Sequence, residues 1–213
     1  SGPPRPSMRV FLTGGTGLLG SHTASLLVRG GHEVVALCRR GADIAFLQSL
    51  QCAVVTGDVT DAPAFLEPLV RGCSHVVHGA ALVYTGGDWP AIRRVNVEGT
   101  RNVLEAAVQA RVAHVVHISS VAVYGTVDGE VDERSPVDTP IPASDLYARS
   151  KREAERVARE VEAVTGMPVT VLRVRPGEAF ALETEDCYSG NLRTPRDVFT
   201  KDMWGTVNPA TGP

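Results

Sequence analysis

The chain has 213 residues, of which 43% are hydrophobic, which is enough for one hydrophobic core or for one domain with an appendage. Its formal net charge of −3 argues against a general nucleic-acid-binding protein. No apolar run approaches the roughly 20 residues of a membrane span and no secretory signal is evident, so we expect a cytoplasmic protein that acts without a membrane.

Apolar strands and helices alternate from Met8 to Arg173, after an N-terminal linker or tag remnant over residues 1–7. The segments predicted to be buried strands are, in order, MRVFLT, HEVVALC, CAVVTG, SHVVHGA, AHVVHIS and PVTVLR. Near-continuous apolar strands are typical of parallel sheets that are covered on both faces. Helices are expected over residues 18–29, 89–109 and 145–165. The alternation therefore predicts a doubly wound α/β sheet with right-handed crossovers.

The sequence VFLTGGTGLLGSH joins the first predicted strand to the first predicted helix. Gly14 permits a tight turn, Gly17 lets the backbone approach a pyrophosphate, and Gly20 lets the helix pack closely on the strand. A pyrophosphate would then meet free N–H groups at the positive end of the helix. A glycine triplet can be no more than a turn, but its position here favours a phosphate-binding site, to which Thr16 and Leu18 also belong.

The second predicted strand ends without the acidic residue that usually binds the ribose 2′-hydroxyl of NAD. Instead, Cys38 is followed by Arg39 and Arg40, and no carboxylate occurs before Asp43. A guanidinium group suits a 2′-phosphate, so we expect NADP as the cofactor, with NAD possible. The alternative is a pair of solvated arginines at the end of a strand.

The loop after the third predicted strand has the sequence GDVTD. Because ligands of such sheets bind beyond the carboxyl ends of the strands, Asp58 and Val59 are expected to lie beside the adenine. Thr60 or Asp61 is expected to cap the next helix through its side-chain oxygen.

The four cysteines, Cys38, Cys52, Cys73 and Cys187, are scattered along the chain and form no CxxC pair. Free thiols in a reducing compartment are therefore favoured over a disulfide framework or a zinc site. No metal site is expected.

The sequence LYARSK begins the third predicted helix and places Tyr147 and Lys151 four residues apart on one face. A phenol with a pKa near 10 needs a nearby positive charge to act at neutral pH, and lowering it by about three units requires about 4 kcal/mol. Alone, this spacing is more typical of a solvated helix. However, Ser119 and Ser120 close the fifth strand at the ligand-binding edge of the sheet, and Asn96 is expected to support the same site through a water or a backbone carbonyl.

Together these motifs resemble the extended short-chain dehydrogenase/reductase family, which includes NAD(P)-dependent epimerases, dehydratases and dihydroflavonol-reductase-like enzymes. The matching sequences follow the family's order over about residues 8–173 and are TGGTGLLG, GDVTD, HGAA, NVEGTRNVLEAA, ISSVAVYG, DERSP and YARSK. The resemblance implies a Rossmann-like domain that transfers hydride between NADP(H) and an alcohol or carbonyl carbon of a small-molecule substrate.

The resemblance also implies roles for individual residues. Tyr147 would be the general acid/base, and Lys151 would lower its pKa and hold the nicotinamide ribose. Ser120 would orient the substrate carbonyl or hydroxyl, while Ala80 and Ala81 would line the cofactor.

The C-terminal part of the chain departs from this family. In the family the sixth strand leads through LRPGxxYGP into a substrate-binding region, whereas here Val174 and Arg175 precede Pro176 and no YGP follows. Residues 174–213 instead resemble a fragment of the acetamidase/formamidase family in ETED and NPATGP. We therefore expect a β-rich appendage in place of the substrate lobe, in an engineered chimera or a recombination product.

Two functions remain open at this point. One is a working NADP-dependent oxidoreductase or epimerase, and the other is a dinucleotide-binding module without efficient turnover because its substrate lobe is replaced. Amide hydrolysis, or a metal cluster at Glu183, Glu185, Asp186 and Cys187, is less favoured than a solvated strand and turn. Unpaired strand edges in the appendage predict self-association into a homodimer or homo-oligomer.

Overall fold

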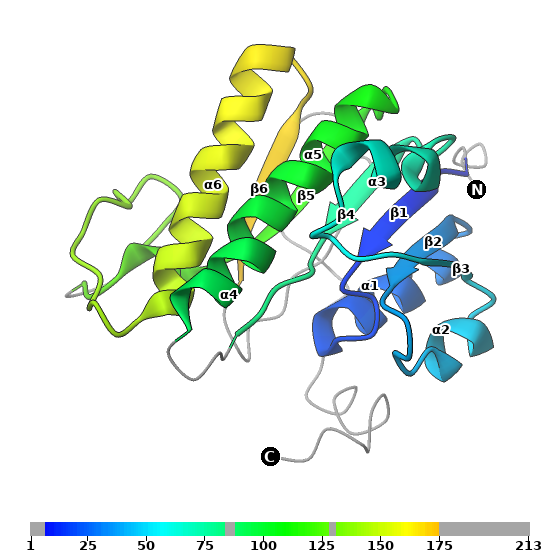
Figure 1. The fold of residues 1–213 in the computed structure, drawn as a ribbon, viewed down its shortest axis with the longest axis horizontal. Coiled ribbons are helices and arrows are strands. Elements are labelled where there is room, and N and C mark those ends of the chain that lie inside the picture. Colours follow the sequence, from blue (N-terminus) through cyan, green and yellow to red (C-terminus); the bar gives the residue numbers. More distant parts are fainter. Residues whose placement is uncertain (1–6, 84–87, 128–130, 175–213) are drawn as a thin grey trace, which may run out of the picture.

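Six parallel strands form one sheet in the order β3-β2-β1-β4-β5-β6 in the computed structural model, which describes residues 7–83, 88–127 and 131–174 (Figure 1). The strands are β1 (Arg9–Thr13), β2 (Glu33–Cys38), β3 (Ala53–Thr56), β4 (His75–His78), β5 (His114–Ser120) and β6 (Val169–Val174). The strand segments and the parallel, Rossmann-like α/β class predicted from the sequence are thus confirmed. The β-rich structure predicted for residues 174–213 lies, beyond Val174, outside the described residues.

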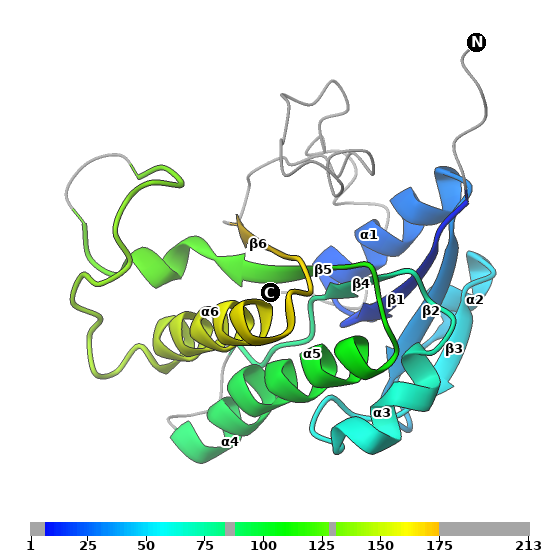
Figure 2. The same cartoon turned by 90° about the horizontal axis from the view of Figure 1, so that it is seen from above.

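Helices cover both faces of this sheet (Figure 2). They are α1 (Leu18–Arg29), α2 (Ala45–Ser49), α3 (Pro63–Val70), α4 (Trp89–Arg93), the π-helix η1 (Arg94–Glu98), α5 (Gly99–Gln109), the 3-10 helix η2 (Val121–Tyr124) and α6 (Leu146–Thr165). Helices α1 and α2 pack on one face, and α3, α5 and α6 pack on the other.

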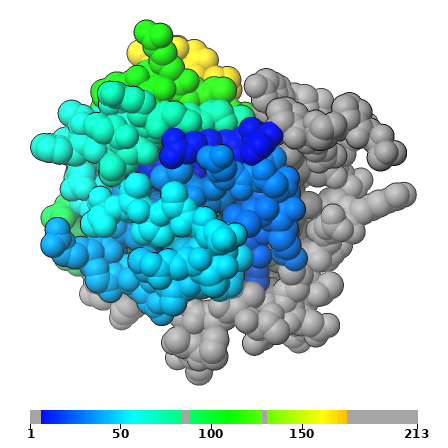
Figure 3. All heavy atoms as spheres, turned by 90° about the vertical axis from the view of Figure 1, so that its right-hand side faces the viewer, coloured from blue at the N-terminus to red at the C-terminus, as the bar shows by residue number. Residues whose placement is uncertain are grey.

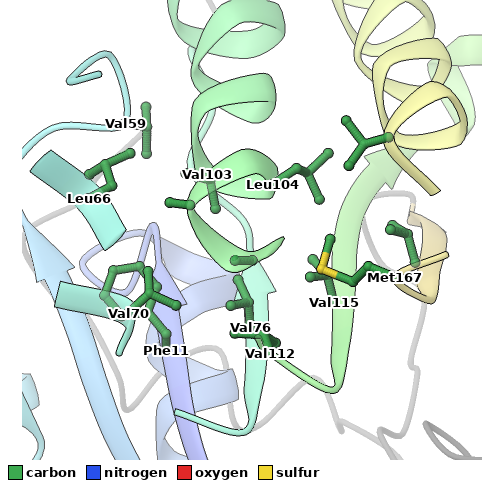
Figure 4. Close-up of a cluster of buried hydrophobic side chains, with 14 of the residues drawn as sticks. Phe11, Val59, Leu66, Val70, Val76, Val103, Leu104, Val112, Val115 and Met167 are labelled. Atoms are coloured by element: carbon green, nitrogen blue, oxygen red, sulfur yellow. The ribbon is translucent and has the colours of Figure 1, made fainter. Parts of the chain in front are cut away.

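Alternate side chains of each strand enter two separate hydrophobic cores, because successive residues of a strand point to opposite faces. Phe11, Val76 and Val115 belong to the core under α3, α5 and α6, which Figure 4 shows in close-up. Their neighbours Leu12 and Val77 belong to the core under α1 and α2. Every central strand is therefore buried on both faces, which explains its near-continuous apolar sequence.

The sequence predicted the first and third of its helices closely. Helix α6 begins after Asp145, whose carboxylate accepts the N–H of Ala148 at 2.9 Å, and ends at Gly166 in the left-handed conformation (φ 73°). The predicted cap of α3 was wrong. That helix starts after Ala62 without a side-chain cap, because the Asp61 carboxylate instead accepts the N–H of Asp58 at 2.8 Å.

The helix expected over residues 89–109 is present, but one turn of it is wider than an α-helix. Residues 94–98 form the π-helix η1 between α4 and α5. π-Bulges within α-helices are frequent at functional sites, and this one carries the buried Asn96.

Figure 3 shows the side of the molecule formed by the N-terminal half of the chain, in blue and cyan.

Among the helices of the described residues, none combines the length and the apolar character that crossing a bilayer requires.

Candidate functional site

Two glycines of the turn between β1 and α1 are required by the local geometry. Gly14 has φ +77°, and a Cβ on it would lie 2.7 Å from the carbonyl carbon of Gly79. A Cβ on Gly20 would lie 2.1 Å from the carbonyl oxygen of Gly14. Both distances are too short for any side chain, so the turn brings β1, α1 and the end of β4 into direct backbone contact.

The N-terminus of α1 has the properties of an anion-binding site. Its N-cap is Gly17, which makes no side-chain capping bond, and its first turn contains no acidic residue. The first N–H groups and the positive end of the helix dipole are therefore available to a phosphate group. A Cβ on Gly17 would meet only the Gly14 carbonyl oxygen, at 3.3 Å, so this glycine leaves open space on the side away from the turn.

A cavity of about 410 Å³ lies against this turn, at the carboxyl ends of the first four strands. Its lining includes most of the residues that the sequence analysis assigned to the cofactor, namely Gly14, Thr16, Gly17, Arg39, Asp58, Val59, Ala80 and Ala81. Leu18, Gly20, Arg40 and Lys151 do not line it. Gly20 serves the close contact described above, while Arg40 is exposed outside the cavity. The cavity thus occupies the position at which open α/β sheets bind their ligands.

The polar groups of the cavity include two arginines and one aspartate. Arg39 and Arg94 are both exposed. Arg94 was not predicted as a site residue, because no sequence motif connects residues 94–98 to the glycine turn. The Asp58 carboxylate accepts the backbone N–H and the hydroxyl of Thr60, each at 2.9 Å. These bonds fix the loop after β3, so Asp58 shapes the cavity wall in addition to lining it.

Lys151, four residues after Tyr147 on α6, is the most deeply buried charged side chain of the described residues, with 3% of its surface exposed. Its Nζ donates to the carbonyl oxygen of Ile118 at 2.6 Å. Burial lowers the pKa of Lys151 to about 8, against the opposing effect of Glu155. Around neutral pH the amine therefore still carries a proton.

Tyr147 is half-buried one turn before Lys151, and its surroundings raise the pKa of its phenol. Burial is the main cause, hydrogen bonding by Ser120 lowers the pKa, and Asp145 raises it again. The sequence analysis expected the Lys151 ammonium to lower this pKa. The protein alone has the opposite effect, because desolvation of the phenolate outweighs the stabilising contacts. Tyr147 is accordingly held as a neutral phenol, which is the form that donates a proton.

The two serines at the end of β5 have different partners. Ser120 is 8% exposed, and its hydroxyl accepts the N–H of Ala122 at 3.2 Å, which starts the η2 turn. Ser119 donates to Glu155 at 2.6 Å, and Glu155 also accepts two bonds from Arg173 at 3.0 and 2.8 Å. Ser120 also hydrogen-bonds to Tyr147, while Ser119 belongs to a partly buried ion-pair network that joins α6 to β6.

Asn96 connects the cavity to the helix of Tyr147. Its side-chain oxygen accepts the N–H of Leu82 at 2.7 Å, and its amide donates to the Leu82 carbonyl at 2.8 Å and to the Ser150 hydroxyl at 2.9 Å. Ser150 in turn donates to the carbonyl oxygen of Tyr147 at 2.7 Å. Leu82 lines the cavity, so one amide side chain holds the cavity wall and the start of α6 in a fixed relation.

These features fit a dinucleotide cofactor. The glycine cradle, the uncapped helix and the cationic cavity suit a pyrophosphate. In the three described ranges, no three or more His, Cys, Asp and Glu side chains gather as metal ligands would. Cys38, Cys52 and Cys73 are free and buried. Glu183, Glu185, Asp186 and Cys187 lie outside the described residues.

Comparison with known protein families gives a match over residues 10–177, to the model of the NAD dependent epimerase/dehydratase family. A putative dihydroflavonol 4-reductase of Synechocystis sp. is 39% identical over 153 residues, which cover 70% of this chain and 43% of the relative. Sterol demethylase protein B of Methylococcus capsulatus is 35% identical over 167 residues, covering 78% of this chain and 50% of the relative. The chain thus spans about half the length of these curated relatives.

A solved structure has a similar fold. The crystal structure of DesIV, a dTDP-glucose 4,6-dehydratase from Streptomyces venezuelae with NAD and TYD bound, matches with a TM-score of 0.69 and 31% identity. The match covers 78% of this chain and 55% of that one. The matched family segment also extends to residue 177, past the point where the sequence analysis placed a join.

Proposed function

Because this chain belongs to the NAD dependent epimerase/dehydratase family, we propose that residues 8–173 bind a nicotinamide dinucleotide and hold the acid/base group for hydride transfer at an alcohol or carbonyl carbon. The observation that carries this proposal is the physical link between two sites. The cavity at the glycine turn is joined through Leu82, Asn96 and Ser150 to the helix that bears Tyr147 and Lys151.

Each region of the cavity has a distinct task in this proposal. The turn at Gly14 and Gly17, with the N-terminus of α1, binds the pyrophosphate. Asp58 and Val59 contact the adenine, Ala80 and Ala81 form the inner wall, and Arg39 contacts the adenosine ribose. Lys151, which does not line the cavity, binds the nicotinamide ribose.

In the reaction the bound nicotinamide supplies or accepts the hydride. Tyr147 moves the proton, since its phenol is neutral and next to Ser120. Ser120 orients the oxygen of the substrate, and its backbone and hydroxyl are fixed by the start of η2. Lys151, protonated at neutral pH, adds a fixed positive charge four residues along the same helix face.

We further propose that the cofactor is NADP in preference to NAD. The cavity has Arg39 where an NAD site has an acidic side chain, and a guanidinium group pairs well with a 2′-phosphate. The substrate is a small molecule with a secondary alcohol or a ketone, a group that reduction of a dihydroflavonol would also involve.

A second candidate function is a dinucleotide-binding module without efficient turnover. It is favoured by the sequence after Val174, where Arg175 precedes Pro176 and no YGP follows, in contrast to the family's pattern. Within this alternative, residues 174–213 are a joined β-rich segment of another origin, and the protein self-associates through that segment in the cytoplasm. Sedimentation of the full chain at micromolar concentration tests the self-association.

A side-by-side thermal-shift titration with NADPH and NADH tests the main proposal. Stabilisation by a ligand grows with the logarithm of its concentration over its dissociation constant. We expect both dinucleotides to stabilise the protein and NADPH to bind about tenfold more tightly, which corresponds to ~1.4 kcal/mol. No shift with either dinucleotide would overturn the proposed function.

Arg39 and Arg40 form a matched pair of variants for the same titration. Arg39 lines the cavity and Arg40 does not, although both are exposed and adjacent in sequence. Arg39→Ala should abolish the preference for NADPH and leave NADH binding unchanged, whereas Arg40→Ala should change neither. An equal effect of both substitutions would show that the preference comes from general charge and not from a specific contact.

A further inference from the structure

Two neighbouring strands carry the same sequence, His-Val-Val-His, in β4 and in β5. Their register places His78 opposite His117, and the two rings stack with centroids 5.4 Å apart and an interplanar angle of 26°. Each of these side chains is 1% exposed. They therefore sit at the same depth, on the same face of the sheet, beneath the helices α5 and α6.

The two stacked rings differ completely in their hydrogen bonds. His78 contacts the Thr13 hydroxyl through Nδ1 at 2.7 Å and the Thr100 hydroxyl through Nε2 at 2.9 Å. For His117, neither ring nitrogen has a hydrogen-bond partner among the described residues. Burying a polar group without a partner costs stability. The two histidines are alike in burial and position, so they can be compared to find what the hydrogen bonds of His78 do.

The direction of every bond around His78 follows from its neighbours. The Thr100 hydroxyl lies 2.7 Å from the carbonyl oxygen of Asn96, which can only accept, so the single hydroxyl proton of Thr100 is used there. Thr100 must then accept from His78, which places the ring proton on Nε2. The neutral ring accepts at Nδ1, so the Thr13 proton points to it, and Thr13 accepts the N–H of Ala80 at 3.2 Å.

The result is a chain of hydrogen bonds, here called the relay, in which every donor points in the same direction along the chain. It runs from the Ala80 N–H through Thr13, His78 and Thr100 to the Asn96 carbonyl. Both ends of the relay belong to the site. Ala80 lines the cavity, and Asn96 is the residue whose side chain holds Leu82 and Ser150.

We propose that His78 is a positioning residue, whose Nε2–H tautomer holds the turn after β4 and the π-helix η1 together and so sets the cofactor wall relative to Tyr147. The imidazole contacts neither substrate nor cofactor in this assignment. It acts through Thr13 on the backbone at Ala80, and through Thr100 on the backbone at Asn96. The effect on the cofactor rests on the proposed function, whereas the tautomer and the rigidity of the turn do not.

The surroundings of His78 keep the relay in one state at neutral pH. Burial lowers the pKa of His78 to about 3, and the positive charge of Lys151 acts in the same direction. Burial, Lys151 and His78 likewise lower the pKa of His117, the other titratable ring that faces it. Protonation would place an N–H opposite Thr13 and reverse that bond, so the relay requires the neutral ring.

Nitrogen NMR of the histidine side chains in the full-length protein tests the tautomer directly. We expect the His78 signals to report a neutral ring with its proton on Nε2, unchanged from pH 8 to pH 5. A proton on Nδ1, or a titration near pH 6.5, would overturn the proposal. Assignment rests on the loss of the signals in His78→Gln.

The consequence for the site is tested with His78→Leu and, as the matched control, His117→Leu. We expect His78→Leu to speed hydrogen exchange of the Ala80 and Leu82 amides at least tenfold and to weaken NADPH binding about tenfold. His117→Leu should change neither, because that ring makes no hydrogen bond to the site. His78→Gln retains a donor directed at Thr100 and should recover part of both effects. Equal behaviour of the two leucine variants would overturn the proposal.

The positioning role of His78 and the proposed dinucleotide binding can fail independently. If the unchanged protein binds neither dinucleotide, the proposed function fails, and the tautomer and the amide exchange alone decide whether His78 holds the turn. If His78→Leu does not fold, His78→Gln and the NMR measurement on the unchanged protein decide. In that case a proton on Nδ1 of His78 in the parent protein is enough to exclude a positioning role for His78.

Discussion

The Lys151 ammonium is buried against a single carbonyl oxygen, so the folded protein keeps a charge that water would solvate better. Its pKa of about 8 lies below the usual 10.5. The resulting loss of stability is complete below pH 8, declines as the pH rises, and is absent above pH 10.5, where both states are neutral. This lowering of the Lys151 pKa corresponds to a loss of about 3 kcal/mol in the free energy of unfolding.

Lys151→Met should therefore stabilise the fold while it impairs the site. We expect the free energy of unfolding at pH 7 to rise by about 1–2 kcal/mol, since removal of the charge is partly offset by loss of the bond to Ile118. The gain should vanish above pH 10.5. Urea denaturation at both pH values measures it, and a loss of stability at pH 7 would contradict the prediction.

Tyr147→Phe gives the complementary result, because the phenol is only half-buried and its hydroxyl is the proposed proton donor. We expect turnover on a panel of carbonyl substrates to fall at least 100-fold. NADPH binding and unfolding free energy should stay almost unchanged. Turnover that survives the substitution would assign the proton transfer to another group.

Roles for single residues could be proposed from the sequence where a motif is contiguous. Tyr147, Lys151 and Ser120 could be proposed as site residues because each belongs to a short pattern at an element end. The partner of Asn96 was expected to be a water or a backbone carbonyl, and the structure gives the carbonyl of Leu82. His78 was passed over as part of a buried strand, because its partners Thr13 and Thr100 are distant in sequence.

At the scale of elements, the unit formed by β1, its turn and α1 depends on two glycines in different ways. A methyl group on Gly20 would collide with the Gly14 carbonyl oxygen at 2.1 Å, and that backbone cannot move without separating α1 from β1. Gly20→Ala should therefore destabilise the protein by about 3 kcal/mol or more. Thermal or urea unfolding measures this loss.

Gly17→Ala is the matched substitution in the same turn. Its methyl group would approach only the Gly14 carbonyl oxygen, at 3.3 Å, and its φ of −83° suits any residue. The fold should keep its stability within about 1 kcal/mol, while NADPH binding weakens because the methyl group occupies the approach of the pyrophosphate. Equal losses of stability in the two variants would refute this division of roles.

Element types were largely predictable because buried strands and amphipathic helices have different periods. The π-helix was not, since one widened turn leaves the apolar spacing of residues 89–109 almost unaltered. The five-residue helix α2 is too short to produce a periodic pattern. The start of α3 was misplaced because Asp61 serves the preceding loop.

At the scale of the whole molecule, buried histidines make the fold sensitive to mild acid. The surroundings lower the pKa of His22, His75, His78 and His117, in each case mainly through burial. Below pH 6.5 the unfolded chain gains protons on these rings and the folded protein does not. Stability is therefore full above pH 6.5 and declines as the pH falls.

Two fully buried rings should dominate this decline. His78 and His117 together imply a slope of about 2.7 kcal/mol per pH unit below pH 6, at ~1.4 kcal/mol for each proton. Urea denaturation between pH 6.5 and pH 5 measures the slope. His117→Leu should reduce it by about half, and a slope that is flat over this range would contradict the prediction.

The position of β1 between β2 and β4 has a consequence for how the protein is made. Of the six strands of this sheet, β1 leaves the ribosome first and lies in the interior, and the hydrogen bond between Thr13 and His78 spans 65 residues. A nascent chain can pair β1 with β2 early, but one edge of β1 stays open until β4 has emerged. During that interval the apolar side chains of Phe11 and Leu12 lack the contacts that β4 later provides, so a chaperone would find its target at β1.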